Sequence, residues 1–163
     1  MIRKASISDA NEIAYILVHS WQINFKGIIP DDYLNKMDVE KITEGIKKTI
    51  EVSTLFVYVV ENKVVGFVGC GHNRIQKFSS FDRELHAIHV LPEYKGNGIG
   101  KALFVEVRDL ILNQGYTNMV LSVFEDNPAT FFYEKLGGKL LGTRTVEYGG
   151  TQCVERVYGW NFI

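Results

Sequence analysis

A glycine-rich turn in the middle of the chain limits what the chain can fold into more than any other segment does. Gly96, Gly98 and Gly100 lie close together between residues 83–91, a predicted strand, and residues 101–113, a predicted helix with apolar side chains at helical spacing. Glycines at such a junction adopt backbone angles that other residues resist, and they let a ligand approach the chain closely. The first amides of the helix would point outward, which is the geometry that binds phosphate groups.

Three phosphate-binding patterns can be compared with this turn. A P-loop needs Ser or Thr after its Gly-Lys pair, and this chain has Ala102 there. A dinucleotide-binding fingerprint needs a further glycine at a position that Lys101 or Leu103 occupies. The remaining pattern is a cation, two residues and then Gly-x-Gly. The chain matches that pattern with Lys95, Gly98 and Gly100. A glycine-rich turn that binds nothing remains the alternative for the glycines alone.

The predicted elements follow the order β-α-α-β-β-β-α-β-α-β-β, which indicates an α/β fold with a mixed sheet in one domain, residues 1–163. The expected strands are 1–5, 55–61, 64–71, 83–91, 118–124, 139–148 and 151–162. The expected helices are 10–25, 30–51 with breaks, 101–113 and 128–136. Asp9 is predicted to begin the first helix in a capping box with Glu12. Asn62 and Lys63 are predicted to form the turn of the first hairpin.

Composition excludes several classes of protein. The chain has 163 residues, of which 46% are hydrophobic and 23% charged, as in a globular domain. Its net charge of -1 argues against binding nucleic acid by bulk electrostatics. The longest strongly apolar run, residues 55–60, is far shorter than the ~20 residues that span a bilayer. No targeting segment is recognised at the start of the chain. We therefore expect a cytoplasmic protein that binds neither membrane nor nucleic acid.

The cysteines and histidines do not form a metal-binding pattern. Cys70 and Cys153 are far apart in the sequence and have no C-x-x-C or Cys/His ligand spacing. His86 and His89 are three residues apart, whereas side chains on one face of a strand are two apart. We expect no metal, and we expect both cysteines to be core thiols.

A second motif follows the turn after one helix and one strand. It begins at Asn127 and ends in Tyr133-Glu134-Lys135-Leu136-Gly137. Together with Val90-Leu91-Pro92 and the Lys95-x-x-Gly98-x-Gly100 pattern, this motif resembles the GNAT superfamily of N-acetyltransferases. The chain departs from the family pattern in two places. Lys95 stands where Gln or Arg is usual, and the Asn-to-Tyr spacing is one residue short, so Asp126 is an alternative to Asn127.

The resemblance implies a mostly antiparallel, mixed central sheet of six to seven strands with flanking helices. It also implies that acetyl-CoA is the co-substrate and that the strand over 84–91 carries a bulge and lies beside the pantetheine arm. A backbone N–H near Ile88 would stabilise the oxyanion of the thioester carbonyl. The residues that the resemblance assigns to the co-substrate are Ile88, His89, Val90, Lys95, Gly96, Asn97, Gly98, Ile99, Gly100, Lys101 and Asn127.

Three residues are candidates for the chemistry. Tyr133 occupies the place where the family has the tyrosine that protonates the leaving thiolate, and a core aromatic is the alternative reading. Glu84 lies eleven residues before Lys95, at the family's offset for a general base, and a solvated strand-end carboxylate is the alternative. His86 lies two residues further on the same predicted face and could share or replace that role. No Cys-His or Ser-His arrangement indicates a covalent intermediate.

The acceptor is expected to be a primary amine of a small molecule or a protein N-terminus. Trp21, Phe25 and Tyr33 lie in the first helices, which in this superfamily wall the acceptor pocket, although simple core packing is the alternative for each. Two other functions stay open: a non-catalytic acyl-CoA-binding module, and an enzyme that uses a different acyl-CoA. The apolar closing hairpin is compatible with a homodimer.

Overall fold

The computed structural model describes residues 1–163, and its seven strands join in one sheet. The strands are β1 (Ile2–Lys4), β2 (Thr54–Val60), β3 (Lys63–His72), β4 (Arg83–Val90), β5 (Asn118–Phe124), β6 (Lys139–Tyr148) and β7 (Thr151–Asn161). Their order across the sheet is β1-β2-β3-β4-β5-β7-β6. All neighbours are antiparallel except β4 and β5, which are parallel. The predicted mixed, mostly antiparallel sheet is confirmed.

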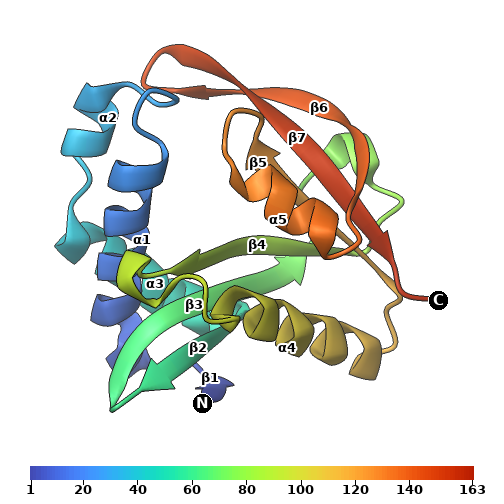
Figure 1. The fold of residues 1–163 in the computed structure, drawn as a ribbon, viewed down its shortest axis with the longest axis horizontal. Helices are drawn as coiled ribbons and strands as arrows, with labels where there is room; N and C mark the ends of the chain where they lie inside the picture. The colour runs from blue at the N-terminus through green and yellow to red at the C-terminus, as the bar shows by residue number, and fades with distance from the viewer.

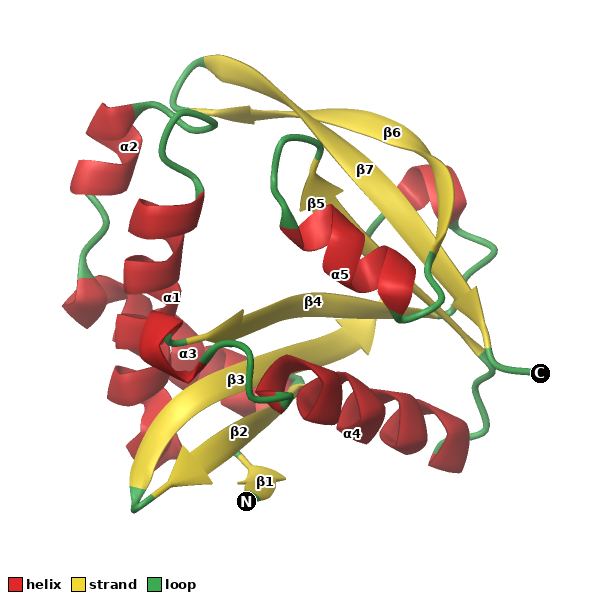
Figure 2. Ribbon diagram, viewed as in Figure 1, coloured by secondary structure: helices red, strands yellow, loops and turns green.

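Helices cover both faces of this sheet (Figures 1 and 2). They are α1 (Ala10–Asn24), α2 (Asp31–Asn35), α3 (Val39–Val52), α4 (Ile99–Asn113) and α5 (Ala129–Lys135). Helices α4 and α5 lie in front of the sheet in Figure 1, and α3 lies behind it. The helical stretch predicted with breaks over residues 30–51 is confirmed as two helices, α2 and α3, and Asp38 caps the second by accepting a hydrogen bond from the Glu40 amide. None of the helices combines the length and the apolar character that crossing a bilayer would require.

Helix α4 shows why the sequence pattern succeeded. Leu103, Val107 and Ile111 are all fully buried at four-residue spacing, so they form one apolar stripe against the sheet. Burying a side chain of this kind stabilises a fold by about 1.5–3 kcal/mol. The helix ends at Asn113, before Gly115 with its positive φ of 86°.

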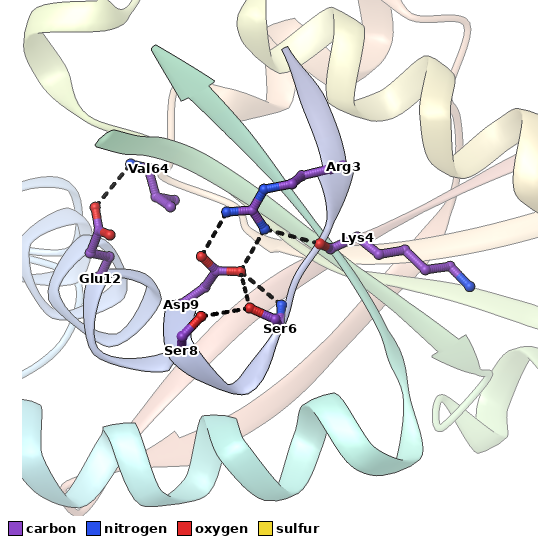
Figure 3. A network of polar contacts seen from close by, with 7 residues as sticks. All are labelled: Arg3, Lys4, Ser6, Ser8, Asp9, Glu12 and Val64. Atoms are coloured by element: carbon purple, nitrogen blue, oxygen red, sulfur yellow. Dashed lines mark hydrogen bonds and ion pairs between the residues drawn. The ribbon is translucent and has the colours of Figure 1, made fainter. Parts of the chain in front are cut away.

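Asp9 is the N-cap of α1, as predicted, but it does not form the predicted capping box with Glu12. The Asp9 carboxylate accepts no hydrogen bond from the amides of α1. It accepts hydrogen bonds from the Ser6 amide at 2.7 Å and from both terminal nitrogens of Arg3 at 2.7 and 2.9 Å (Figure 3). The Arg3 hydrogen bonds are the main reason that the pKa of Asp9 falls to about 2. Glu12 accepts a hydrogen bond from the Val64 amide of β3 at 2.9 Å. The predicted Asp9–Glu12 capping box is therefore wrong, because each carboxylate has a partner outside the helix.

The two hairpins differ in how well they were predicted. The turn between β2 and β3 lies at Glu61 and Asn62, whose φ angles are 47° and 65°, one residue earlier than predicted. Two successive positive φ angles are typical of a type I′ turn, whose twist matches that of the strands. The β6–β7 hairpin turns at Gly149 and Gly150 as predicted, again with positive φ angles.

The tip of the β6–β7 hairpin packs against α1 and α2. A small cluster of buried side chains joins these parts: Phe25, Ile29, Leu34, Phe124 and Cys153. Trp21 and Tyr33 each meet the ring of Tyr148 edge-on, at 5.9 and 5.7 Å between centroids. This packing closes one end of the molecule over the face of β5 and β7 that points away from α5.

Candidate functional site

Strands β4 and β5 separate almost as soon as they meet. Their only paired residues are Glu84 and Val120, and beyond this pair the two strands diverge (Figure 1). A bulge lies just past the junction, because Cys70 of β3 pairs with Leu85 and the preceding residue pairs with Ala87, so His86 has no opposite residue. A bulge bends its strand and increases the local twist. The predicted bulge in this strand is confirmed, and it accompanies an opening in the middle of the sheet.

The backbone of β4 faces this opening without a partner strand. The Leu91 amide donates to the Val65 carbonyl of β3 at 2.9 Å. Backbone groups of successive residues in an antiparallel strand point to opposite sides, so those of Ile88 and Val90 point away from β3. They face the opening and can receive an extended ligand. The backbone of His89 points toward β3, and its ring lies 5.4 Å from that of Phe67, so His89 does not reach the opening.

The glycine-rich turn leads from β4 into α4 and presents a row of free amides. Gly98 is the N-cap of α4 with a φ of 77°, and Gly96 has a φ of 81°. The first amide of this segment to donate within the helix is that of Ala102, which reaches the Gly98 carbonyl at 3.0 Å. The six amides of residues 96–101 donate to no group of the chain. Free amides at the positive end of a helix dipole form an anion site, and this one suits a diphosphate.

The polar side chains of the turn are only loosely held. Lys95 makes a single long contact, 3.5 Å from its ammonium nitrogen to Asn24 at the end of α1. Asn97 folds back and donates to the Tyr94 carbonyl at 3.1 Å, which shapes the turn. Lys101 is exposed and forms no ion pair. Its ammonium and that of Lys95 are therefore both available to an anion.

Phe132 joins the two sequence motifs and was not among the predicted site residues. A β-carbon on Gly100 would lie 3.1 Å from Phe132 Cζ and 4.0 Å from Ile88 Cγ2. A larger residue than glycine at position 100 would therefore collide with α5, whether or not a ligand is bound at the turn. The sequence offered one indication that Phe132 belongs to the site, which is its position directly before Tyr133 in the second motif. Asn127 accepts a hydrogen bond from the Ala129 amide at 2.9 Å, in the turn that leads into α5.

Tyr133 lies on the face of α5 that is turned toward the sheet. It is buried, with its ring against those of Phe132 and Trp160. Its hydroxyl makes no hydrogen bond within the chain, yet it is not one of the enclosed polar atoms without a partner, so the oxygen keeps access to solvent. Burial raises the pKa of this hydroxyl and keeps its proton in place throughout the neutral range.

Glu84 is fully occupied by Arg74 of the β3–β4 connection. Its carboxylate accepts hydrogen bonds from the Arg74 amide at 2.8 Å, from Nε at 3.1 Å and from Nη2 at 3.0 Å. The Glu84 side chain is 3% exposed, whereas that of Arg74 is 67% exposed. Three of the roughly four lone-pair positions of the carboxylate therefore accept from Arg74, and the exposed arginine is the partner that can move.

His86 has the opposite character, because its ring forms no ion pair. Its Nε2 is enclosed and has no hydrogen-bond partner. The ring lies over β3, where a β-carbon on Gly71 would come within 2.9 Å of its Cε1 and 3.6 Å of Ser53 Oγ. Burial, and then the charge of Arg74, lowers the pKa of His86. The imidazole is therefore neutral at neutral pH, with an unpaired nitrogen that could take up a proton if the ring turned toward the opening.

Three further polar residues, Ser122, Arg144 and Glu155, lie on the same face of the sheet as Glu84. Arg144 of β6 donates to Glu155 Oε1 at 3.0 Å and to Ser122 Oγ at 3.0 Å. Glu155 is buried, and burial raises the pKa of its carboxyl, with Arg144 opposing the rise and Glu84 adding to it. This face, bounded by the aromatic cluster around Tyr148, lies opposite to α4 and α5. No group of three or more His, Cys, Asp or Glu side chains comes together in a way that could hold a metal ion.

Comparison with known proteins gives a consistent result. The family model described as "Acetyltransferase (GNAT) family" matches residues 17–138. An uncharacterized N-acetyltransferase of Bacillus subtilis (strain 168), YuaI, is 29% identical over 159 residues, which cover 98% of this chain and 91% of that protein. Among solved structures, an N-acetyltransferase from Staphylococcus aureus Mu50 aligns with a TM-score of 0.77 at 21% identity, covering 100% of this chain and 98% of that one. The PaiA N-acetyltransferase of Thermoplasma acidophilum in complex with coenzyme A aligns with a TM-score of 0.71 at 20% identity, covering 99% and 98%.

Proposed function

This chain belongs to the Acetyltransferase (GNAT) family, and from that premise we propose that it transfers the acetyl group of acetyl-CoA to a primary amine. The observation that carries the proposal is the row of free amides over residues 96–101, which follows the unpaired end of β4 along the chain. A ligand with a diphosphate and an extended amide-bearing arm matches both features. Acetyl-CoA supplies the acetyl group in an activated form, as a thioester.

The residues of this chain would bind the co-substrate in two ways. The amides of the turn, with Lys95 and Lys101 nearby, hold the diphosphate. The backbone groups of Ile88 and Val90 hydrogen-bond to the arm as an added strand would. The Ile88 amide then donates to the thioester carbonyl, where negative charge develops during attack.

Two proton transfers complete the proposal. An amine with a pKa of ~10.4 is mostly charged at neutral pH and must lose a proton before it attacks. His86 is the preferred of the two candidate bases, because its ring forms no ion pair while Glu84 is held by Arg74. Its enclosed Nε2 would reach the amine only after the ring rotates. Tyr133, whose hydroxyl has no partner in the chain, donates a proton to the departing thiolate.

Attack is proposed to be direct, without an acyl-enzyme. Burial raises the pKa of both Cys70 and Cys153, so neither thiol is a ready nucleophile. Cys153 lies in the cluster below the hairpin tip, away from β4. Acceptor, acetyl-CoA and protein would therefore meet in one ternary complex, and kinetics that vary both substrates would give intersecting rather than parallel lines.

The acceptor is proposed to enter on the face that carries Glu84 and Glu155, below the aromatic rings of Trp21, Tyr33 and Tyr148. A small-molecule amine and a protein N-terminus both fit the proposal. The test is release of free CoA thiol from acetyl-, propionyl- and succinyl-CoA across a panel of both kinds of amine, beside calorimetric titration of each acyl-CoA. Tight binding without release for any amine would favour the non-catalytic module, and preference for a longer acyl group would favour the other alternative.

A homodimer through the closing hairpin is also kept as a proposal. Leu140 of β6 and Val154 of β7 are 54% and 42% exposed, so the hairpin presents apolar side chains that a second copy could cover. Light scattering of the wild type beside Leu140→Ser/Val154→Ser would test it, since a monomeric wild type rules it out.

A further inference from the structure

Arg83, the first residue of β4, is a buried cation without an anionic partner. It is 8% exposed, and it takes part in none of the ion pairs of the chain. Every other arginine of the chain forms an ion pair. Burying a charge is costly unless the charge is paired and hydrogen-bonded. The position of Arg83 therefore requires a physical explanation.

The contacts of Arg83 within the chain are incomplete. Its guanidinium carbon lies 5.0 Å from the centre of the Tyr116 ring, a cation–π contact that offsets part of the cost. Its Nη1 is 3.5 Å from His72 Nδ1, at the limit of a hydrogen bond. Its Nε is fully enclosed and has no acceptor. An arginine has five N–H donors, so most of its hydrogen-bonding capacity is unused.

A polar pocket lies beside this side chain. Its volume is about 290 Å³, and its lining residues come from the ends of α3 and β3 and the starts of β2 and β4: Glu51, Val52, Ser53, Thr54, Cys70, Gly71, His72 and Arg83. Ser53 and Thr54 add hydroxyl groups that can donate to an anion. Glu51 is exposed and forms no ion pair with Arg83, so the one acidic residue of the pocket leaves the cation unpaired.

We propose that this pocket binds a small oxyanion, a carboxylate or phosphate group, through Arg83. The planar guanidinium presents parallel donors that match two oxygens of either group, and the tyrosine ring holds the plane in place. The site is separate from the turn at residues 96–101, because Arg83 and that turn lie at opposite ends of β4, about 23 Å apart along a strand of this length. Arg83 and Glu84 are adjacent, so their side chains lie on opposite faces of the sheet.

The experiment compares thermal unfolding in inorganic phosphate, in sodium acetate and in sodium chloride at equal ionic strength. It uses the wild type, Arg83→Met, and Arg108→Met as the matched control, since Arg108 lies on the surface of α4 and pairs only with Asp109. Each protein is measured with and without saturating CoA, so that phosphate bound at residues 96–101 does not contribute in the CoA series. Arg83→Met should fold, because an apolar side chain replaces an unpaired buried charge.

The wild type and Arg108→Met should be stabilised by phosphate or acetate beyond the effect of chloride, with and without CoA. Arg83→Met should bind the effective anion at least about tenfold more weakly. Glu51→Gln should bind it more tightly, because a repelling carboxylate is removed. Equal responses of wild type and Arg83→Met, or no oxyanion effect beyond chloride, would overturn the proposal. The comparison of wild type with Arg83→Met does not need CoA to bind. Its outcome therefore tests the oxyanion site separately from the proposed acetyl transfer.

Discussion

Phe132 of α5 lies directly against Gly100 in the first turn of α4, so that a β-carbon on Gly100 would come within 3.1 Å of Phe132 Cζ. The start of α4 and the helix α5, which carries Tyr133, therefore touch at this point. One added methyl group there would force them apart. We expect Gly100→Ala to push α5 outward and to weaken CoA binding several-fold. Phe132→Leu should tolerate the alanine better, so the double variant should show a coupling free energy of about 0.5–3 kcal/mol. Additive effects on CoA affinity, measured by calorimetry, would show that the contact does not couple the two helices.

Gly98→Val tests the anion site itself. A β-carbon on Gly98 meets nothing within 4 Å, so the change acts through its φ of 77°, which a β-branched residue resists. The amides of the turn should be displaced, and CoA affinity should fall at least about tenfold. Gly115→Val is the control, because it has the same backbone strain at the other end of α4, with a φ of 86°. Comparable losses of CoA affinity in both variants would mean that general destabilisation explains the effect.

Tyr133→Phe removes only a hydroxyl that has no partner in the chain. Turnover should fall, by up to about 10²-fold for a lost general acid, while acetyl-CoA affinity changes little. Tyr158→Phe is the matched control. Its hydroxyl donates to Glu134 Oε1 at 2.7 Å, so that variant should lose about 1 kcal/mol of stability and keep its turnover. If Tyr133→Phe turns over as fast as wild type while acetyl transfer limits the rate, Tyr133 is a packing residue.

The identity of the base can be read from pH–rate profiles of Glu84→Gln and His86→Gln. A variant that lacks the base should lose turnover at neutral pH and recover at high pH, where the amine loses its proton unaided. We expect this recovery for His86→Gln. Glu84→Gln should lose turnover at every pH, because it breaks the contacts with Arg74 that hold the β3–β4 connection. Recovery in Glu84→Gln alone would make Glu84 the base.

The wild-type profile carries a further expectation. Since the pKa of His86 is lowered from its ordinary value of 6.5, the ring stays neutral to a lower pH than a free histidine would. Turnover should therefore hold below pH 6.5 before it declines as the ring takes up a proton. A decline centred above pH 6.5 that is absent from His86→Gln would contradict the lowered pKa.

Asp9 should make the fold sensitive to acid. Its folded pKa is about 2, below its ordinary value of 3.8, so its ionised form stabilises the fold above pH 3.8, and this stabilisation is lost as the pH falls toward 2. Asp9→Asn should be less stable than wild type at pH 6, and the difference should shrink at pH 2.5. Chemical denaturation of both proteins at the two pH values measures this. A constant difference would show that packing, and not the charge contact with Arg3, is what Asp9 supplies.

The sequence pattern predicted the elements and the glycine turn between β4 and α4 well, because both depend on local periodicity and on glycine spacing. It failed where a residue's partner is distant in the chain. Glu12 was given to its own helix, but its partner is the Val64 amide on β3. The partner of Glu84 is Arg74, which lies in a connection without periodicity. Such contacts depend on where the sheet brings two segments together, which no local window of sequence contains.

The single pair that joins β4 to β5 has a consequence for the unliganded protein. Beyond Glu84, β4 is an edge strand that lies in the middle of a sheet, with its free backbone groups inside the molecule. Proteins commonly protect such edges with charges, prolines or covering loops, because an open edge invites another chain to pair with it. Here the protection would come from the bound co-substrate, whose extended arm would hydrogen-bond to the free backbone groups of β4. We therefore expect the protein to be more prone to self-association when its supply of CoA is exhausted.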